Sequence, residues 1–210
     1  MITRISGADT DALTRRARRL AQAGPRRLLG VTGSPGAGKS TLTATLVSAI
    51  APAAVLVPMD GFHLADAELD RLGRRDRKGA PDTFDAAGYV ALLQRLRAGG
   101  PETVYAPRFD RHREEAIAGA IPVATDVPLV ITEGNYLLHD DGAWAAVRPL
   151  LDEVWYVDID DGLRVERLIR RHVEHGRSPE AAREWVLRSD EVNAELVART
   201  RDRADVVVAL

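Results

Sequence analysis

Residues 33–40 read G-S-P-G-A-G-K-S, a glycine-rich run that ends in a lysine and a serine. The run matches the pattern G-x-x-x-x-G-K-[ST] at every fixed position. In that pattern backbone N–H groups surround phosphate, the lysine reaches two phosphates and the serine hydroxyl binds Mg²⁺. The sequence therefore predicts a nucleotide phosphate site here. The residues expected to form it are Gly33, Ser34, Gly36, Ala37, Gly38, Lys39, Ser40 and Thr41.

Two acidic residues each follow an apolar run, Asp60 after residues 53–59 and Glu133 after residues 129–132. We expect Glu133 to serve a metal together with Ser40, and Asp60 to act as a general base. Transfer of a phosphoryl group to a hydroxyl needs a carboxylate that accepts the proton, while Lys39 stabilises the phosphoryl group. The alternatives are a turn-forming aspartate before Gly61 and a capping or surface role for Glu133.

A basic helix over residues 162–175 is interrupted at Gly176 and Arg177. Its apolar side is predicted to face inward and Arg164 outward, with Leu163 and Leu168 on the inner face. Such a segment is typical of a lid, because closing arginines stabilise the transferring phosphoryl group and exclude water. We expect catalytic roles for Arg167 and Arg170, and nucleotide contacts from Arg171 and Arg177.

These residues require a scaffold in which apolar strands alternate with helices. Strands are predicted at residues 28–31, 53–59, 129–132, 154–159 and 205–208, and helices at 10–23, 39–50, 85–98, 162–175 and from 178 onward. The fold class is therefore α/β, a parallel sheet of about five strands with helices on both faces. Ligands bind beyond the carboxyl ends of such strands, where the glycine loop, Asp60 and Glu133 converge. Residues 64–82 are predicted to be irregular.

The bulk properties indicate one domain, residues 1–210, with a hairpin insertion at about 104–124 and the lid at about 162–180. The 210 residues are 45% hydrophobic and 29% charged, with a net charge of −2 and no cysteine. Disulfides, zinc–thiolate sites and cysteine nucleophiles are excluded. The balanced charge gives no case for nucleic-acid or membrane partners. Without an apolar signal core at the N-terminus, we expect a cytoplasmic location.

The chain resembles the P-loop kinases of the phosphoribulokinase, uridine kinase and pantothenate kinase superfamily. The resemblance is strongest to the bacterial branch called nucleoside/nucleotide kinase-like or fructose-transport-kinase-like. It covers about residues 26–208. Its motifs are G-S-P-G-A-G-K-S-T (33–41), P-M-D-G-F-H (58–63), K-G-A-P-D-T-F-D (78–85), Y-A-P-R-F-D-R (105–111), E-G-N-Y-L-L (133–138), R-x-x-R-R…G-R (167–177) and T-R-D-R-A-D (200–205).

The resemblance implies the P-loop NTPase fold, ATP and Mg²⁺ as cofactors, and a small-molecule acceptor. It places Asp60 on the acceptor side, Ser40 and Glu133 at the metal, and residues 200–205, including Arg203, near adenine. It also implies acceptor contacts from residues 78–85 and 105–112. The acceptor-binding residues expected on these grounds are Asp60, His63, Phe84, Arg108, Asp110, His112 and Asn135.

The resulting hypothesis is an ATP-dependent kinase that phosphorylates a hydroxyl of a nucleoside, a sugar, or a pantothenate-like or glycerate-like acid. One alternative is a nucleotide kinase whose phosphate acceptor is clamped by Arg108 and Arg111. Another is a non-catalytic nucleotide-dependent switch, which would need a base-specificity motif such as N-K-x-D, and the sequence has none. The proline-containing hairpin is a candidate contact for a homodimer.

Overall fold

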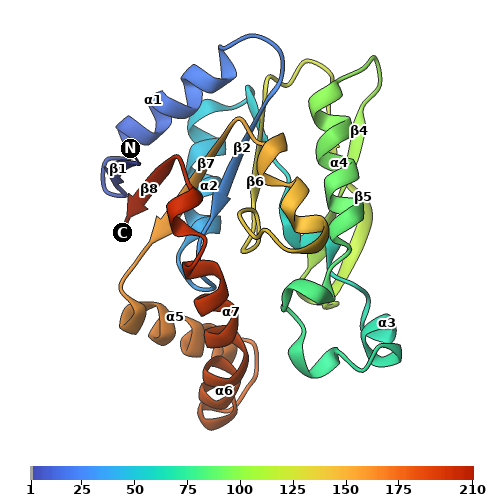
Figure 1. Ribbon diagram of the computed structural model, residues 1–210, viewed down its shortest axis with the longest axis vertical. Helices are drawn as coiled ribbons and strands as arrows, with labels where there is room; N and C mark the ends of the chain where they lie inside the picture. Colours follow the sequence, from blue (N-terminus) through green and yellow to red (C-terminus); the bar gives the residue numbers. More distant parts are fainter. Residues whose placement is uncertain (1) are drawn as a thin grey trace.

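A parallel six-stranded sheet forms the centre of the protein (Figure 1). The computed structural model describes residues 2–210. The strand order is β1-β8-β7-β2-β6-β3, and every neighbouring pair runs parallel. The strands are β1 (Thr3–Ser6), β2 (Arg27–Thr32), β3 (Ala54–Leu56), β6 (Leu129–Glu133), β7 (Glu153–Asp158) and β8 (Val206–Ala209).

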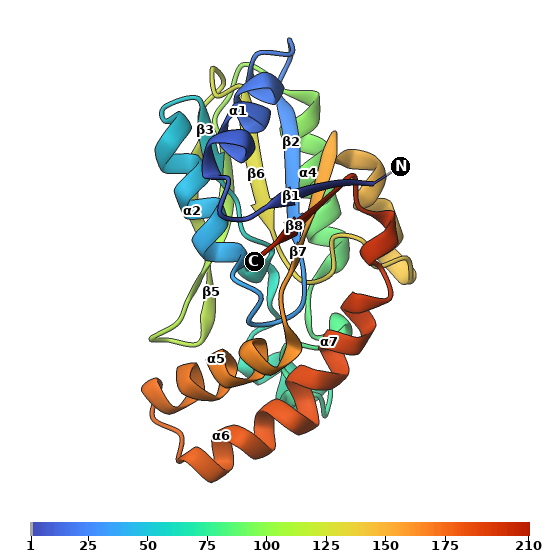
Figure 2. The same ribbon diagram turned by 90° about the vertical axis from the view of Figure 1, so that its left-hand side faces the viewer.

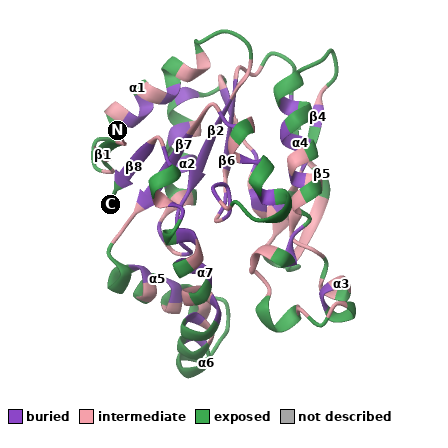
Figure 3. Ribbon diagram, in the orientation of Figure 1, coloured by how far each residue is buried: buried purple, intermediate pink, exposed green. Residues whose placement is uncertain are grey.

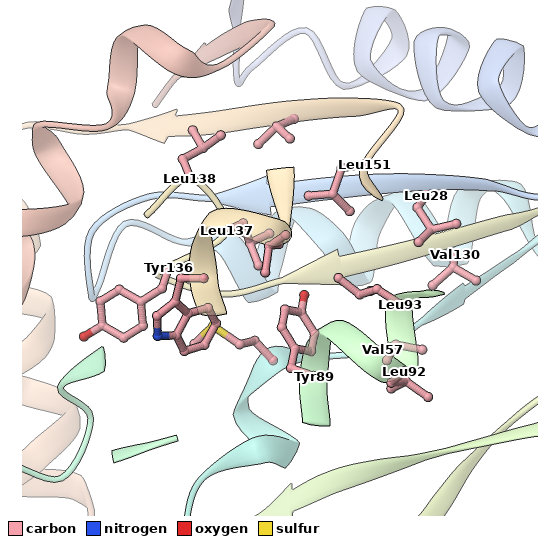
Figure 4. Close-up of a cluster of buried hydrophobic side chains, with 14 of the residues drawn as sticks. Leu28, Val57, Tyr89, Leu92, Leu93, Val130, Tyr136, Leu137, Leu138 and Leu151 are labelled. Atoms are coloured by element: carbon pink, nitrogen blue, oxygen red, sulfur yellow. The ribbon is translucent and has the colours of Figure 1, made fainter. Parts of the chain in front are cut away.

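Apolar side chains alternate between the two faces of the sheet, and helices bury both sets. On one face α1 (Thr10–Ala21) and α2 (Lys39–Ile50) cover Leu29 and Ile131. On the other, α4 (Ala86–Ala98) and residues 136–151 cover Leu28 and Val130 (Figures 3 and 4). Side chains of a strand alternate in direction, so strands buried on both sides appear as continuous apolar runs. The predicted α/β fold is confirmed.

The strand β1 was not predicted, and the sheet has six strands instead of about five. Residues 3–6 read T-R-I-S, with one large apolar side chain, and three of the four residues are exposed. Backbone hydrogen bonds pair these residues with β8 at the edge of the sheet. Such pairing does not require an apolar run, so the sequence does not reveal it.

The hairpin is confirmed as β4 (Val104–Asp110) and β5 (Glu115–Val123), a separate antiparallel sheet of two strands. The segment predicted to be irregular contains a helix, α3 (Asp66–Arg71), and two short 3₁₀ turns. Ion pairs fix this segment, because Asp66 binds both Lys78 at 2.7 Å and Arg75 at 2.8 Å. Only the folded arrangement brings these charges together.

A helical arm extends below the carboxyl ends of the strands (Figure 2). It consists of α5 (Asp161–Glu174), α6 (Pro179–Trp185), a π-helical turn (Val186–Asp190) and α7 (Glu191–Ala198). Across residues 2–210 no helix is both long and apolar enough to cross a membrane.

The orientation predicted for α5 is wrong at two positions. Arg164 is buried at 2% exposure, whereas Leu163 is 41% exposed. The Arg164 guanidinium lies beneath the glycine loop, where it donates to the Pro35 carbonyl and pairs with Glu191 at 2.8 Å. Helical patterns assign arginine to the solvent-exposed face. Carbonyl and carboxylate oxygens satisfy the buried Arg164 guanidinium, so this arginine lies on the inner face of α5 instead.

Candidate active site

The glycine loop connects β2 to α2 at the carboxyl edge of the sheet. Gly36 and Gly38 have φ of +80° and +94°, which favour glycine. A Cβ at Gly36 would lie 2.7 Å from Cγ of Leu168, so the loop also packs tightly on α5. The loop, together with the first turn of α2, therefore forms the compact backbone cradle that binds phosphate in such motifs.

Lys39 is held inside this loop by three acceptors. Its ammonium donates to the carbonyls of Gly33 at 2.8 Å and Ser34 at 3.0 Å, and to Oδ1 of Asn135 at 2.8 Å. Burial lowers the pKa of Lys39 to about 8, although the carboxylates of Glu133 and Asp60 oppose the change. A lysine with a depressed pKa in a phosphate loop is expected to gain charge stabilisation when phosphate arrives.

The order of strands explains why Asp60 and Glu133 lie beside the loop. Strand β6 is hydrogen-bonded to β2 on one side and to β3 on the other, and Glu133 is paired with Val31. Asp60 follows β3 in a 3₁₀ turn over Met59–Phe62. Three neighbouring strands therefore bring Lys39, Glu133 and Asp60 to one place.

Gly61 has a packing role beside Asp60. A Cβ at Gly61 would lie 2.5 Å from the carbonyl oxygen of Pro107 in β4. The glycine therefore permits close approach of the hairpin to Asp60. Asp60 itself pairs with Arg111 at 3.4 Å across this contact.

Ser40 and Glu133 offer oxygens suited to Mg²⁺. The Glu133 carboxylate accepts a hydrogen bond from the Thr43 hydroxyl at 3.4 Å. Burial raises the pKa of Glu133, and the nearby Ser40 hydroxyl and Lys39 charge oppose the change. Within residues 2–210 no group of three or more His, Cys, Asp or Glu side chains could hold a metal by itself. Mg²⁺ in phosphoryl-transfer sites takes one or two protein oxygens and completes its shell with phosphates and water. The donor set fits such an ion.

A cavity of about 570 Å³ opens in front of these groups. It lies between the glycine loop, the hairpin, the segment after α3 and the helical arm. The predicted residues that line it are Gly36, Lys39, Ser40, Asp60, His63, Phe84, Glu133, Asn135, Arg171 and Arg177. The structure thus assembles residues that span about 140 positions of the chain.

Several other predicted residues lie outside the lining of this cavity. Arg170 is exposed and pairs with Glu166 at 2.8 Å. Arg203 donates to the Leu138 carbonyl at 2.7 Å and pairs with Asp140. These bonds hold both guanidinium groups away from the cavity in this conformation.

The hairpin residues Arg108, Asp110 and His112 also lie outside the lining. Asp110 caps the hairpin turn by accepting the backbone N–H groups of residues 112 and 113. Arg167 lies outside as well, with its guanidinium 3.9 Å from where a Cβ of Gly38 would be. Its guanidinium therefore lies near the amino end of α2.

One side of the cavity has an aromatic wall. The His63 ring lies between Phe84, with centroids 4.0 Å apart, and Phe109, with centroids 4.7 Å apart. Burial lowers the pKa of His63 and so favours the neutral form of the ring. Lys78 lies over Phe109 at 5.3 Å. A neutral, stacked imidazole can donate or accept a hydrogen bond but adds no charge.

Arginines from opposite sides face each other across the opening. Burial lowers the pKa of Arg171, and the positive charge of Arg111 lowers it further. Arg177 stacks on Trp185 at 4.3 Å and lines the same cavity. Like charges held near one another favour an anion between them. The resemblance implied acceptor contacts from residues 78–85 and 105–112 without singling out Lys78, and Arg111 was expected only as a clamp in the nucleotide-kinase alternative. Both side chains line the cavity.

Comparison with known proteins agrees with this geometry. Residues 28–210 match the family described as "Phosphoribulokinase / Uridine kinase family". The chain is similar to YggC of Escherichia coli K12, with 34% identity over 191 residues that cover 88% of this chain and 78% of YggC. It is also similar to a pantothenate kinase of Clavibacter sepedonicus, with 35% identity, but that match covers 62% of this chain and 43% of that protein.

The fold agrees with the crystal structure of a "putative fructose transport system kinase" from Silicibacter sp. TM1040. The TM-score is 0.86 at 37% identity, over 94% of this chain and 98% of that one. The family match spans most of the chain, and the glycine loop, lysine and strand-end carboxylates lie together as a kinase site requires. The chain belongs to the phosphoribulokinase/uridine kinase family and is a P-loop kinase.

Proposed function

We propose that this kinase transfers the γ-phosphoryl group of ATP to a hydroxyl group of a small metabolite, with Asp60 as the general base. The observation that carries the proposal is the position of Asp60. Its carboxylate lines the same cavity as Lys39 and Glu133, and it is close enough to both to influence their charge states. Transfer to a phosphate acceptor would need no base at this place.

In the proposed reaction the acceptor oxygen attacks the γ-phosphorus while the bond from that phosphorus to the leaving oxygen of ADP breaks. The hydroxyl proton passes to the Asp60 carboxylate. Lys39 stabilises the phosphoryl charge from the nucleotide side. Arg171 and Arg177 stabilise it from the arm, where both line the cavity.

ATP binding follows from membership of the family, and we propose Mg²⁺ as its partner. Ser40 would hold the ion through its hydroxyl, and Glu133 directly or through water. When bound, Mg²⁺ neutralises charge on the nucleotide phosphates. The half-buried Glu133, which accepts from the Thr43 hydroxyl, is the feature of this chain that supports the assignment.

The acceptor is proposed to be a small polar metabolite that fills the space between Asp60 and the aromatic wall of His63, Phe84 and Phe109. Names of related proteins mention uridine, pantothenate and fructose transport. A panel of nucleosides, sugars, pantothenate, glycerate and nucleoside monophosphates tests the class. Phosphorylation of monophosphates alone would instead favour the nucleotide kinase, with Arg111 as the acceptor clamp.

Replacing Asp60 with asparagine tests the base directly. Asp60→Asn is expected to lower the transfer rate roughly 10²–10⁴-fold, because a positioned base contributes about that much, while ATP still binds. Asp140→Asn is a matched control, because Asp140 is exposed and outside the cavity. Near-normal turnover of Asp60→Asn on the substrate found with the panel would show that Asp60 is not the base.

A further inference from the structure

A second cavity, of about 520 Å³, is not used by the proposed reaction. Its volume is close to the 570 Å³ of the active-site cavity. One wall is formed by residues 188–199, which belong to the π-helical turn, α7 and the residue after it, and the other by residues 76–82 after α3. Figure 1 shows α7 and the segment after α3 facing each other below the sheet.

The second cavity continues the active-site cavity along both of its walls. Asn193 of α7 lines both cavities. On the opposite wall Gly79 lines the active-site cavity, and the next residue, Ala80, lines the second one. On the arm the neighbours Asp190 and Ser189 are divided between the two cavities in the same way. The two spaces are therefore adjacent, and one ligand can extend from the first into the second.

The inner surface of the second cavity is mostly apolar. Val192 and Leu196 lie one helical turn apart, on the same side of α7, and Ala80 and Pro81 line the other wall. Val192 is 63% exposed although it is a large aliphatic residue. Ligand sites are lined mainly by such apolar groups, with a few polar groups that set orientation. The cavity therefore suits an apolar group of a ligand.

The charged residues of the second cavity do not favour a second phosphate site. Three arginines and three acidic residues line it, so their formal charges cancel. Arg77 is also paired with Asp82 at 2.5 Å. A phosphate would require an excess of positive charge, as Lys39 and Arg171 provide in the active-site cavity. The balance of charge therefore agrees with an uncharged, apolar occupant.

We infer that the second cavity holds an apolar extension of the acceptor whose hydroxyl lies at Asp60. The inference rests on the proposed kinase function and narrows its acceptor to an amphipathic alcohol, with a polar head that carries the reactive hydroxyl and an aliphatic tail. The head occupies the space between Asp60 and the aromatic wall. The tail passes Asn193 and contacts Val192 and Leu196. It adds binding energy without touching the reacting atoms.

Steady-state kinetics with alcohols of graded tail length tests the inference. The probes are alkyl fructosides, N-alkyl cytidines, and N-alkyl amides of glycerate and of pantothenate, each with an ethyl, a butyl or a hexyl tail. In the series whose head is phosphorylated, KM is expected to fall about fourfold for each added CH₂ group that becomes buried. The kcat is expected to stay constant, because the tail binds equally in the substrate complex and the transition state.

Substitutions at Val192 locate the effect in the second cavity. Val192→Asp places a charge where the tail lies and is expected to abolish the dependence of KM on tail length, whereas Val192→Leu is expected to keep it. The exposure of Val192 makes both variants compatible with folding, and thermal unfolding checks this. Leu187→Asp is the matched control, because Leu187 is also exposed on the arm, at 51%, but lines neither cavity. It is expected to behave as the unaltered protein.

A KM that does not depend on tail length, the same dependence in folded Val192→Asp, or rejection of every tailed compound while the bare head is phosphorylated would overturn the inference and leave the kinase proposal intact. A higher Kd of Val192→Asp for a non-hydrolysable ATP analogue would assign the second cavity to the nucleotide and overturn the inference as well. Phosphorylation of none of these alcohols, with or without a tail, would overturn both.

Discussion

Nucleotide affinity should fall as the pH rises through the pKa of Lys39. Burial lowers that pKa from 10.5 to about 8, so Lys39 is about nine-tenths protonated at pH 7 and about one-tenth protonated at pH 9. Bound phosphates favour the charged ammonium and restore a higher pKa in the complex. If only the protonated form binds tightly, the Kd rises about tenfold between pH 7 and pH 9, with proton uptake on binding.

Calorimetry of the ATP analogue in buffers of different ionisation enthalpy measures both quantities. At pH 8 the expected uptake is about half a proton per nucleotide, rising toward one at pH 9. Lys39→Met is the control, since it should bind weakly and with no dependence on pH in this window. A Kd that stays constant from pH 7 to pH 9 with no proton uptake would refute the argument that Lys39 is desolvated before the nucleotide binds.

Two further predictions compare arginines of α5. Arg164→Ala should lower the free energy of unfolding by about 3 kcal/mol in chemical denaturation. The substitution leaves the Glu191 carboxylate without its ion-pair partner and removes the hydrogen bond to the Pro35 carbonyl under the glycine loop. The exposed Arg170→Ala should change it by less than about 0.5 kcal/mol, and equal losses would contradict the buried role. With the acceptor from the panel, Arg171→Ala should reduce kcat at least about tenfold, whereas Arg170→Ala should leave kcat unchanged. A larger loss of kcat in Arg170→Ala than in Arg171→Ala would show that the arm closes with a different face toward the phosphates.

The sequence determined the elements that carry the phosphate chemistry, because their signals are local. The glycine loop needs positive φ at fixed positions, and its strand and helix appear as an apolar run followed by helical spacing. Asp60 and Glu133 were identifiable because each ends such a run. Ser178 and Pro179 likewise mark the start of α6, where the Ser178 hydroxyl accepts the N–H of Ala181.

Tertiary structure alone decided which charges face the site. Arg164, Arg170 and Arg171 share one helix and one residue type, yet the first is buried under the loop, the second pairs with Glu166 and the third lines the cavity. Helical periodicity identifies the apolar face of a helix, but it cannot distinguish the environments of these three guanidinium groups. Their roles depend on what the helix packs against.

The same limit applies to residues distant in sequence. Arg111 reaches Asp60 only because the hairpin folds back over the strand ends, and Gly61 leaves room for that approach. Lys39 donates to the Asn135 side chain, and the Tyr136 hydroxyl donates to the Gly79 carbonyl, and neither bond is visible as a pattern in the sequence. Local sequence thus predicts where phosphate binds, and only long-range packing decided which side chains line the cavity beside that site.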